Sequence, residues 1–384
     1  MANRKSNLYN LYDIRRYVDG DNFKVIMDTA NAKYNTAIWR DFASWGKPSD
    51  SRTWSKGEKT IPILARASLL GTHSRKPLRN TQGWKFYGGS TPKFGHGFGI
   101  DEDDLMKMRE AKNNEGSSWG DLIYDSLITN SENILGGMHN ELSHMCLELA
   151  STGEIHEQSV DGTKYDFTFE FDDNQFYQVD PYWFDTNGDP VETSGGHTVN
   201  VIADILAMQK DLTEVKGRLC DHWKLSLALV DKILDHPSVL KSYLANKDIQ
   251  SGNHSAYIAT RKELLTFMHD RGVWPFHVID FKTTHEEDGQ PVADPPAFDV
   301  HNMTAAYSGQ KMFEIKVTNS IWLDRQRWGG IDPSKMYHFI EGRIAALSKW
   351  EEDPINNVVQ FEMYAGPVFN SLREVAFAKT YVDA

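Results

Sequence analysis

The chain has 384 residues, of which 40% are hydrophobic and 25% are charged. This composition is typical of a globular protein and excludes a disordered or collagen-like chain, and the length predicts two to three domains. No apolar run reaches the roughly 18 residues of a membrane span, and the N-terminus lacks the apolar stretch of a signal peptide. Since no membrane span is expected, we also expect no membrane partner. The sequence has two cysteines, Cys146 and Cys220, which are too few for a disulfide framework, so we expect a reducing compartment.

The charge is unevenly distributed along the chain. The net charge of −13 argues against general binding along nucleic acid, but residues 51–99 hold nine basic residues and one acid, Glu58. The same stretch is rich in glycine and aromatic residues. Three interpretations stay open: a nucleic-acid patch, a solvated basic loop, and an arm that lies on an acidic surface of another copy.

The first hundred residues predict few regular elements. A helix is expected over 24–37, followed by irregular chain over 39–58, which contains glycine, proline and serine. Strands are expected over 59–68 and 93–101 as the two sides of a hairpin. The loop between them has about two dozen residues, which is long for a hairpin and typical of a binding arm.

A long helix is the clearest prediction of the sequence. It is expected over 120–151, after a shorter helix over 102–112, with Gly153 at its end. Gly136 and Gly137 in its middle predict a bend or a close packing contact. An apolar stripe follows one helix face, formed by Leu135, Met138, Leu142, Met145 and Leu149.

The remaining sequence mixes helix and strand patterns, so the predicted fold class is α+β. A hairpin is expected over 154–160 and 165–172, around the turn Asp161–Gly162. Further helices are expected over 198–216, 226–234, 238–244, and from the capping box Thr260–Glu263 to Gly272. Further strands are expected over 276–284, 314–321, 336–340, 358–364 and 374–381, and residues 285–296 are expected to form an exposed loop.

No motif in the sequence predicts an enzyme, a cofactor site or a metal site. The glycine series 95–99 lacks the spacing of a phosphate loop, and residues 185–190 lack the glycine and glutamate of a calcium loop, which favours a turn. His139, Glu141 and His144 gather on the long helix, but the two histidines are five residues apart and HExxH is absent. A metal-dependent hydrolase built on these three residues is the alternative from another class of protein.

The order of several segments along the chain resembles a known family. The segments are LELASTGEI, VDGTKYDFTFEF, VIADILAMQKDL, WKLSLALVDKILDHPSVLKSYL, ELLTFMHDRGV before WPFHVIDF, IDPSKMYHFI, and MYAGPVFNSLREVAFAKTYV. In this order they resemble the major capsid proteins of tailed bacteriophages, in the lambda-type capsid protein E group with the Hong Kong 97-like fold. The resemblance covers nearly the whole chain, and the order of segments carries it rather than any single motif.

The resemblance implies a division of the chain into five parts. Residues 1–58 would form the N-terminal arm and 59–99 the extended E-loop hairpin. Residues 100–213 would form the P-domain with its long spine helix, and 214–360 the A-domain. Residues 361–384 would return to the P-domain.

The resemblance also implies a structural, non-enzymatic function. Copies would assemble into hexamers and pentamers of an icosahedral or prolate head that encloses packaged double-stranded DNA. The protein would be located in the virion capsid, after assembly in the cytoplasm of the bacterial host. Its partners would be a separate scaffolding protein, a portal, a decoration protein, and DNA in non-specific contact. An encapsulin-like shell around a protein cargo is the alternative within the same fold.

Two sets of residues are candidates for these contacts. The candidates for contact between subunits are Trp54, Arg66, Arg75, Lys76, Arg79, Trp84, Lys85, Phe86, Tyr87 and Lys93. The candidates that face DNA are Arg4, Lys5, Arg15 and Arg16. For the aromatic candidates, packing inside their own subunit stays open. No isopeptide crosslink is expected at Lys76, Lys85 or Lys93.

Overall fold

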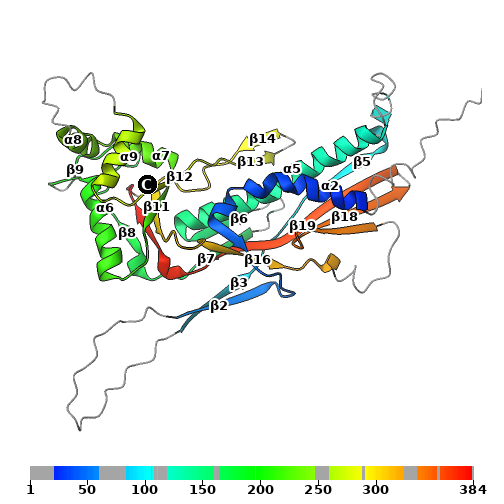
Figure 1. Cartoon of the computed structure of the whole chain (residues 1–384), viewed down its shortest axis with the longest axis horizontal. Helices are drawn as coiled ribbons and strands as arrows, with labels where there is room; N and C mark the ends of the chain where they lie inside the picture. The colour runs from blue at the N-terminus through cyan, green and yellow to red at the C-terminus, as the bar shows by residue number, and fades with distance from the viewer. Residues whose placement is uncertain are drawn as a thin grey trace, which may run out of the picture. The chain divides into compact units, whose positions relative to one another are not determined.

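The computed structural model shows two compact units that mix helices and strands, which confirms the α+β class (Figure 1). It describes residues 21–59, 84–104, 106–107, 110, 119–158, 162, 164–194, 196–246, 259–287, 290–323, 335–352 and 355–382. Unit 1 comprises residues 1–52, 90–146 and 313–368, and unit 2 comprises residues 53–89, 147–312 and 369–384. None of the helices in the described ranges is long and apolar enough to cross a membrane.

The N-terminal part of unit 1 forms helix α2 (Asp21–Ala32), the 3-10 helix η1 (Lys33–Thr36), helix α3 (Trp39–Phe42) and strand β1 (Ala43–Trp45). Helix α2 buries Phe23, Ile26, Met27 and Ala30, whose spacing places them on one face. The helix predicted over 24–37 is therefore confirmed. The prediction of irregular chain from residue 39 is wrong, because β1 pairs in parallel with a strand about 270 residues further along the chain.

The sheet of unit 1 has seven strands, with the order β1-β16-β19-β18-β17 along its main path. The strands are β16 (Phe313–Thr318), β17 (Lys335–Ile340), β18 (Ile344–Glu352) and β19 (Ile355–Phe369). Two short strands, β4 (Lys93–Phe94) and β5 (Gly97–Asp101), both pair with β19. The strand predicted over 93–101 is therefore confirmed in two parts, and its predicted hairpin pairing stays a prediction. Most of the other predicted strand, 59–68, lies outside the described residues.

Helix α5 (Trp119–Thr152) confirms the long helix predicted over 120–151. Its 34 residues span about 51 Å at 1.5 Å per residue. The predicted apolar stripe is buried, with each of its five side chains 2% exposed or less. Gly153 takes a φ of +81° immediately after the helix, which explains the end of α5 at a glycine.

The main sheet of unit 2 has the order β12-β11-β15-β20-β8. Its strands are β8 (Phe176–Gln178), β11 (His222–Ser226), β12 (Phe276–Ile279), β15 (Asn302–Ala306) and β20 (Val375–Lys379). Helices α6 (Val201–Lys210), α7 (Leu227–Asp235), α8 (Pro237–Asn246) and α9 (Arg261–Asp270) confirm the predicted helices, and the π-helix η3 (Asp211–Val215) extends α6. The core between helices and sheet includes Trp183, Trp223 and Tyr243.

Short hairpins complete unit 2. Strands β6 (Glu154–Gln158) and β7 (Lys164–Thr168) confirm the hairpin predicted after the long helix. Strands β13 (Thr284–Glu287) and β14 (Gln290–Ala293) form a hairpin where a loop was expected, so that prediction is wrong. The remaining elements are β9 (Thr193–Ser194), β10 (His197–Thr198), and the 3-10 helices η2 (Asp173–Gln175) and η5 (Leu372–Glu374).

The two glycines in the middle of α5 have different surroundings, which gives a matched test of the packing. A Cβ atom at Gly136 would lie 2.5 Å from the hydroxyl oxygen of Tyr34, whereas no atom lies within 4 Å of a Cβ at Gly137. The Tyr34 hydroxyl also donates to the carbonyl oxygen of Glu132 at 2.6 Å, which restrains it. Gly136 therefore allows a close contact, as predicted.

We expect Gly136→Ala and Gly137→Ala to change the free energy of unfolding in opposite directions. Alanine at 137 should stabilise the chain by up to about 1 kcal/mol, because it favours the helix. Alanine at 136 should destabilise it by about 1–3 kcal/mol, because the clash with Tyr34 outweighs that gain. Denaturant unfolding of both variants measures the difference, and a shift in the same direction for both would contradict this packing.

Candidate functional site

Strands β2 (Thr53–Lys59) and β3 (Trp84–Ser90) form a two-stranded sheet in unit 2, which we call the ribbon. Successive side chains of a strand point to opposite faces, and the exposure of the ribbon residues follows this rule. The less exposed residues are Trp54, Lys56, Glu58, Lys85, Tyr87 and Gly89. The exposed residues are Thr53, Ser55, Gly57, Phe86 and Gly88. The ribbon therefore has an inner face that packs on the rest of unit 2 and an outer face that is exposed.

Aromatic rings hold the inner face of the ribbon. The ring centroid of Trp54 lies 6.2 Å from that of Tyr87 and 6.2 Å from that of Phe169. Tyr87 is 9% exposed, and its hydroxyl donates to the carbonyl oxygen of Phe369 at 3.3 Å. A Cβ atom at Gly89 would lie 2.5 Å from the ring of Phe167, so this ring packs directly on the backbone of β3. Aromatic pairs of this kind add to the stability of a core beyond their buried area.

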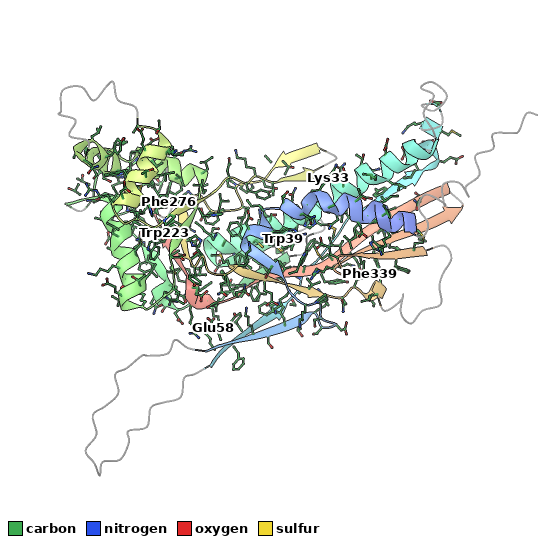
Figure 2. All side chains as sticks on the ribbon, viewed as in Figure 1. Lys33, Trp39, Glu58, Trp223, Phe276 and Phe339 are labelled. Carbon is green, nitrogen blue, oxygen red and sulfur yellow. The ribbon has the colours of Figure 1, made fainter. Side chains whose placement is uncertain are left out.

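Charged side chains fix the same face to the end of β19 and the turn after it. Glu58 is labelled in Figure 2. Its carboxylate accepts hydrogen bonds from the Ser371 hydroxyl at 2.7 Å and the Leu372 backbone N–H at 3.0 Å. It also pairs with the Arg373 guanidinium at 3.3 Å. Lys56 donates to the carbonyl oxygen of Phe369 at 2.7 Å. Hydrogen bonds to ionised groups are stronger than neutral ones, so these contacts anchor the base of the ribbon.

Lys85 anchors the second strand of the ribbon. Its ammonium group donates to the carbonyl oxygen of Glu170 and lies 3.6 Å from the Asp172 carboxylate. Both acceptors belong to the segment that follows β7. Each strand of the ribbon is thus held by at least one cation as well as by aromatic packing.

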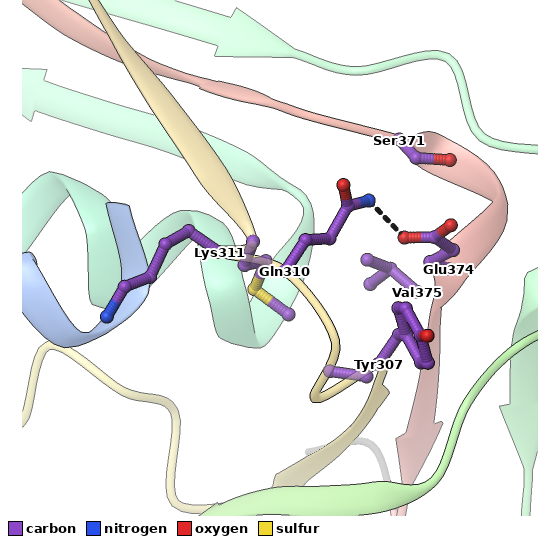
Figure 3. A pocket seen from close by; sticks show the side chains of 8 residues that line it. Tyr307, Gln310, Lys311, Ser371, Glu374 and Val375 are labelled. Carbon is purple, nitrogen blue, oxygen red and sulfur yellow. Dashed lines mark hydrogen bonds between the residues drawn. The ribbon is translucent and has the colours of Figure 1, made fainter. Parts of the chain in front are cut away.

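A small pocket includes Ser371, the hydrogen-bond partner of Glu58, in its lining (Figure 3). Its lining includes Tyr307, Gln310, Ser371 and Glu374, and the Gln310 amide donates to the Glu374 carboxylate. Burial raises the pKa of Glu374. The Ser371 hydroxyl donates to Glu58, so this polar group of the pocket is used for a contact within unit 2.

His139, one of the three residues of the metal cluster predicted on α5, is engaged in hydrogen bonds. His139 is 1% exposed, and the indole N–H of Trp39 donates to its Nδ1 at 3.0 Å. Its Nε2 lies 2.9 Å from the side-chain oxygen of Asn31. Because both ring nitrogens are engaged, neither is free to bind a metal, and the prediction of a hydrolase metal bound through His139 is wrong. The turn predicted at residues 185–190 is confirmed, since Asp185 accepts from the backbone N–H groups of Asn187 and Asp189.

The structure places the predicted contact residues in three groups. Lys85 and the aromatic residues Trp54 and Tyr87 pack within their own subunit, whereas Phe86 is 71% exposed. Trp84 begins strand β3. Eight residues lie outside the described ranges: Arg66, Arg75, Lys76 and Arg79, and the DNA-facing candidates Arg4, Lys5, Arg15 and Arg16.

Lys93 belongs to unit 1 and is paired within it. Its ammonium group lies 2.7 Å from the Glu362 carboxylate, whose side chain is 5% exposed. Burial alone would lower the pKa of Lys93, but the hydrogen bond and charge of Glu362 raise it overall. The anchor residues Lys56 and Glu58 were not predicted, although their alternation with Trp54 was a visible signal.

Comparison with known proteins gives only distant similarities. No family model and no curated protein matches the sequence. Among solved structures, the chain is similar to the putative capsid protein of a prophage of E. coli CFT073, with 13% identity and a TM-score of 0.45, over 77% of this chain and 79% of that chain. It is also similar to a phage-related protein from Bordetella bronchiseptica RB50, with 12% identity and a TM-score of 0.44, over 92% and 95% of the two chains. The capsid of Myoviridae phage XM1 gives 10% identity and a TM-score of 0.39, over 89% and 91%.

TM-scores below 0.5 do not establish a shared fold. The function proposed below therefore depends on the features of this chain and on the contacts described above.

We expect Glu58→Ala to loosen the ribbon, because the Leu372 N–H and the Arg373 guanidinium would lose their acceptor. The cost should be about 1–3 kcal/mol of local stability. Hydrogen exchange should show lower amide protection across β2 and β3. The exposed neighbour Ser55→Ala is the control and should leave protection unchanged. Equal protection in wild type and Glu58→Ala would contradict the anchoring role.

Proposed function

We propose that this chain is a major capsid protein of a tailed bacteriophage, with a structural and non-enzymatic role. Its copies would form the hexamers and pentamers of a head that encloses double-stranded DNA. The observation that carries the proposal is the ribbon, which is firmly anchored on one face and exposed on the other. The resemblance in the order of sequence segments supports the same function, and the long helix α5 agrees with the spine helix that the resemblance implies.

The sequence between the two strands of the ribbon has a strong positive charge. Residues 60–83 contain Arg66, Arg75, Lys76 and Arg79 and no acidic residue. The anchored strands β2 and β3 fix the two ends of this basic segment. A binding segment whose ends are held loses less conformational entropy on binding than a free tail would. This favours a role in contacts with another molecule over a solvated loop.

An acidic partner surface is available on another copy of the chain. The whole chain carries a net charge of −13, so its surface outside the basic segment is acidic. In unit 1, Asp101, Glu102 and Asp103 are adjacent and exposed. Complementary charges steer association and set the register of an interface. We therefore propose that the basic segment of one copy lies on acidic residues of a neighbouring copy.

The exposed face of the ribbon would extend this contact. Phe86 is a large apolar side chain that is 71% exposed between the inward-facing Lys85 and Tyr87. Aromatic residues provide much of the binding energy of protein interfaces. A shell is stabilised by the summed area of such contacts rather than by a single pocket.

The functional division of the chain is part of the proposal. Residues 1–58 would form the arm, 59–99 the extended hairpin, 100–213 the P-domain, 214–360 the A-domain, and 361–384 the return. A scaffolding protein, a portal and a decoration protein would be its partners, and packaged DNA would be in non-specific contact. Nucleic acid inside purified particles would agree with this role, whereas a protein cargo would indicate an encapsulin-like shell.

We expect the combined variant Arg75→Glu, Lys76→Glu, Arg79→Glu to fold normally but to form no closed shells. The reversed charges would repel the acidic surface of the neighbouring copy, since like charges across an interface cost several kcal/mol. Electron microscopy of assembly reactions measures the outcome, and circular dichroism reports the fold. The control Arg75→Lys, Arg79→Lys keeps the charge and should assemble. Normal shells from the reversed variant would contradict the proposal.

We expect Phe86→Ser to weaken assembly while the subunit stays stable. The free energy of unfolding should change by less than about 0.5 kcal/mol, because the ring is mostly exposed. The protein concentration needed for assembly should rise about tenfold, because an interface anchor is lost. Light scattering across a concentration series gives this threshold. Tyr87→Ala, in the buried neighbour, should instead destabilise the subunit; an unchanged threshold for Phe86→Ser would count against an interface at this face.

A further inference from the structure

His139 connects four parts of unit 1 through one buried imidazole. It lies on α5, and its partners Asn31 and Trp39 come from α2 and α3. The Asn31 amide donates to the Glu341 carboxylate at 2.9 Å, in the turn between β17 and β18. The ring of Tyr34, from η1, stacks on the imidazole with centroids 5.3 Å apart. Trp39 and the neighbouring Lys33 are labelled in Figure 2.

The hydrogen bonds define the protonation state of this imidazole. An indole N–H can only donate, so the Nδ1 of His139 must be an acceptor and carries no proton. The proton of the neutral ring is then on Nε2, which donates to the side-chain oxygen of Asn31. A second proton would be added at Nδ1, where it would face the N–H of Trp39. Protonation would therefore replace a hydrogen bond by two opposed donors.

We propose that His139 is an acid-sensitive clip, whose protonation releases residues 21–45 from helix α5. The segment contains α2, η1, α3 and β1, and three of these elements contact the imidazole directly. Trp39 is 1% exposed and Asn31 is 3% exposed, so an imidazolium at this position could not be hydrated unless the segment moves away. This proposal does not depend on the capsid function.

The charged groups around His139 agree with a neutral ring at pH 7. The pKa of His139 is lowered to about 4: burial has the largest effect, the Arg40 cation adds to it, and the Glu341 carboxylate acts in the opposite direction. Arg40 and Glu341 are paired at 3.2 Å, which partly cancels their effects. On α5 and η1, Glu132 is likewise paired with Lys33.

One other histidine contact joins α2 to the sheet. His338 on β17 lies 2.9 Å from the Asp28 carboxylate of α2. Variants at the two positions can separate this contact from the contacts of His139.

The direction of the pH dependence follows from proton linkage. In the released segment, His139 would have the ordinary pKa of about 6.5, and in the closed segment it has the lowered value. The released state therefore binds more protons between about pH 6.5 and 4, and the closed state loses stability as the pH falls through this range. One proton changes the equilibrium about tenfold per pH unit. Below about pH 4 both states are protonated and the dependence stops.

Hydrogen exchange of the full chain between pH 7.5 and 4 tests this proposal. Protection factors, which correct for the pH dependence of exchange chemistry, are compared for peptides from α2 to β1 and for helix α9 in unit 2. We expect protection of the first segment to fall about tenfold per pH unit below about 6.5. Helix α9 should serve as an internal reference with a smaller change. A flat profile for the first segment would overturn the proposal.

Two variants separate the clip from general acid instability. His139→Gln keeps one acceptor for Trp39 and one donor for Asn31 but takes up no proton, so its profile should be flat. His338→Gln should keep the tenfold slope, because the clip is intact. If His139→Gln does not fold, Arg40→Gln is used instead. Removing this cation raises the pKa of His139 in the closed segment, so protection of the segment should stop falling at a higher pH than in the wild type. A tenfold slope that persists in His139→Gln, or an unchanged end point in Arg40→Gln, would refute the clip.

Discussion

The burial of helix α5 is the constraint on which unit 1 depends. Leu135, Met138, Leu142 and Met145 are each 2% exposed or less, so other elements must cover the helix closely. The cover includes polar groups, and a buried polar group needs a hydrogen-bond partner. His139 meets this requirement with Trp39 and Asn31, and the absence of a side chain at Gly136 makes room for Tyr34. The same contacts that complete the core thus make it sensitive to acid.

The two faces of the ribbon in unit 2 have different roles: the inner face stabilises the subunit, and the outer face is available for contacts with other molecules. Its inner face is used for anchoring, through the buried ring of Tyr87 and the three contacts of Glu58 with residues 371–373. Its outer face has small exposed residues and Phe86, and its strands lead into the basic residues of the sequence between them. A substitution on one face should therefore affect folding, and a substitution on the other should affect assembly. This separation is the physical basis of the proposed shell function.

Local patterns in the sequence predicted the helices and the hairpin after α5, because stripes, caps and turns depend on neighbouring residues. The capping box of Thr260 and Glu263 is an example, since both of its hydrogen bonds form within four residues. Strands β1 and β15 were missed for two other reasons. Strand β1 depends on its pairing with β16, which is distant in the sequence. Strand β15 (NMTAA) is buried at nearly every position and so shows no alternation. Glu58 was missed because its hydrogen-bond donors, Ser371 and Leu372, lie 313 and 314 positions further along the chain. The alternation of Trp54, Lys56 and Glu58 indicates a shared strand face, but their distant partners cannot be identified from the neighbouring residues.

The most direct test of the capsid account is negative-stain electron microscopy of the purified full-length protein across a concentration series, with the charge-reversed variant beside it. The account predicts closed shells, curved sheets, or rings of five or six subunits for the wild type, and separate subunits for the variant with Glu at 75, 76 and 79. Wild-type protein that stays monomeric at every concentration, with and without a co-expressed scaffolding protein, would contradict it.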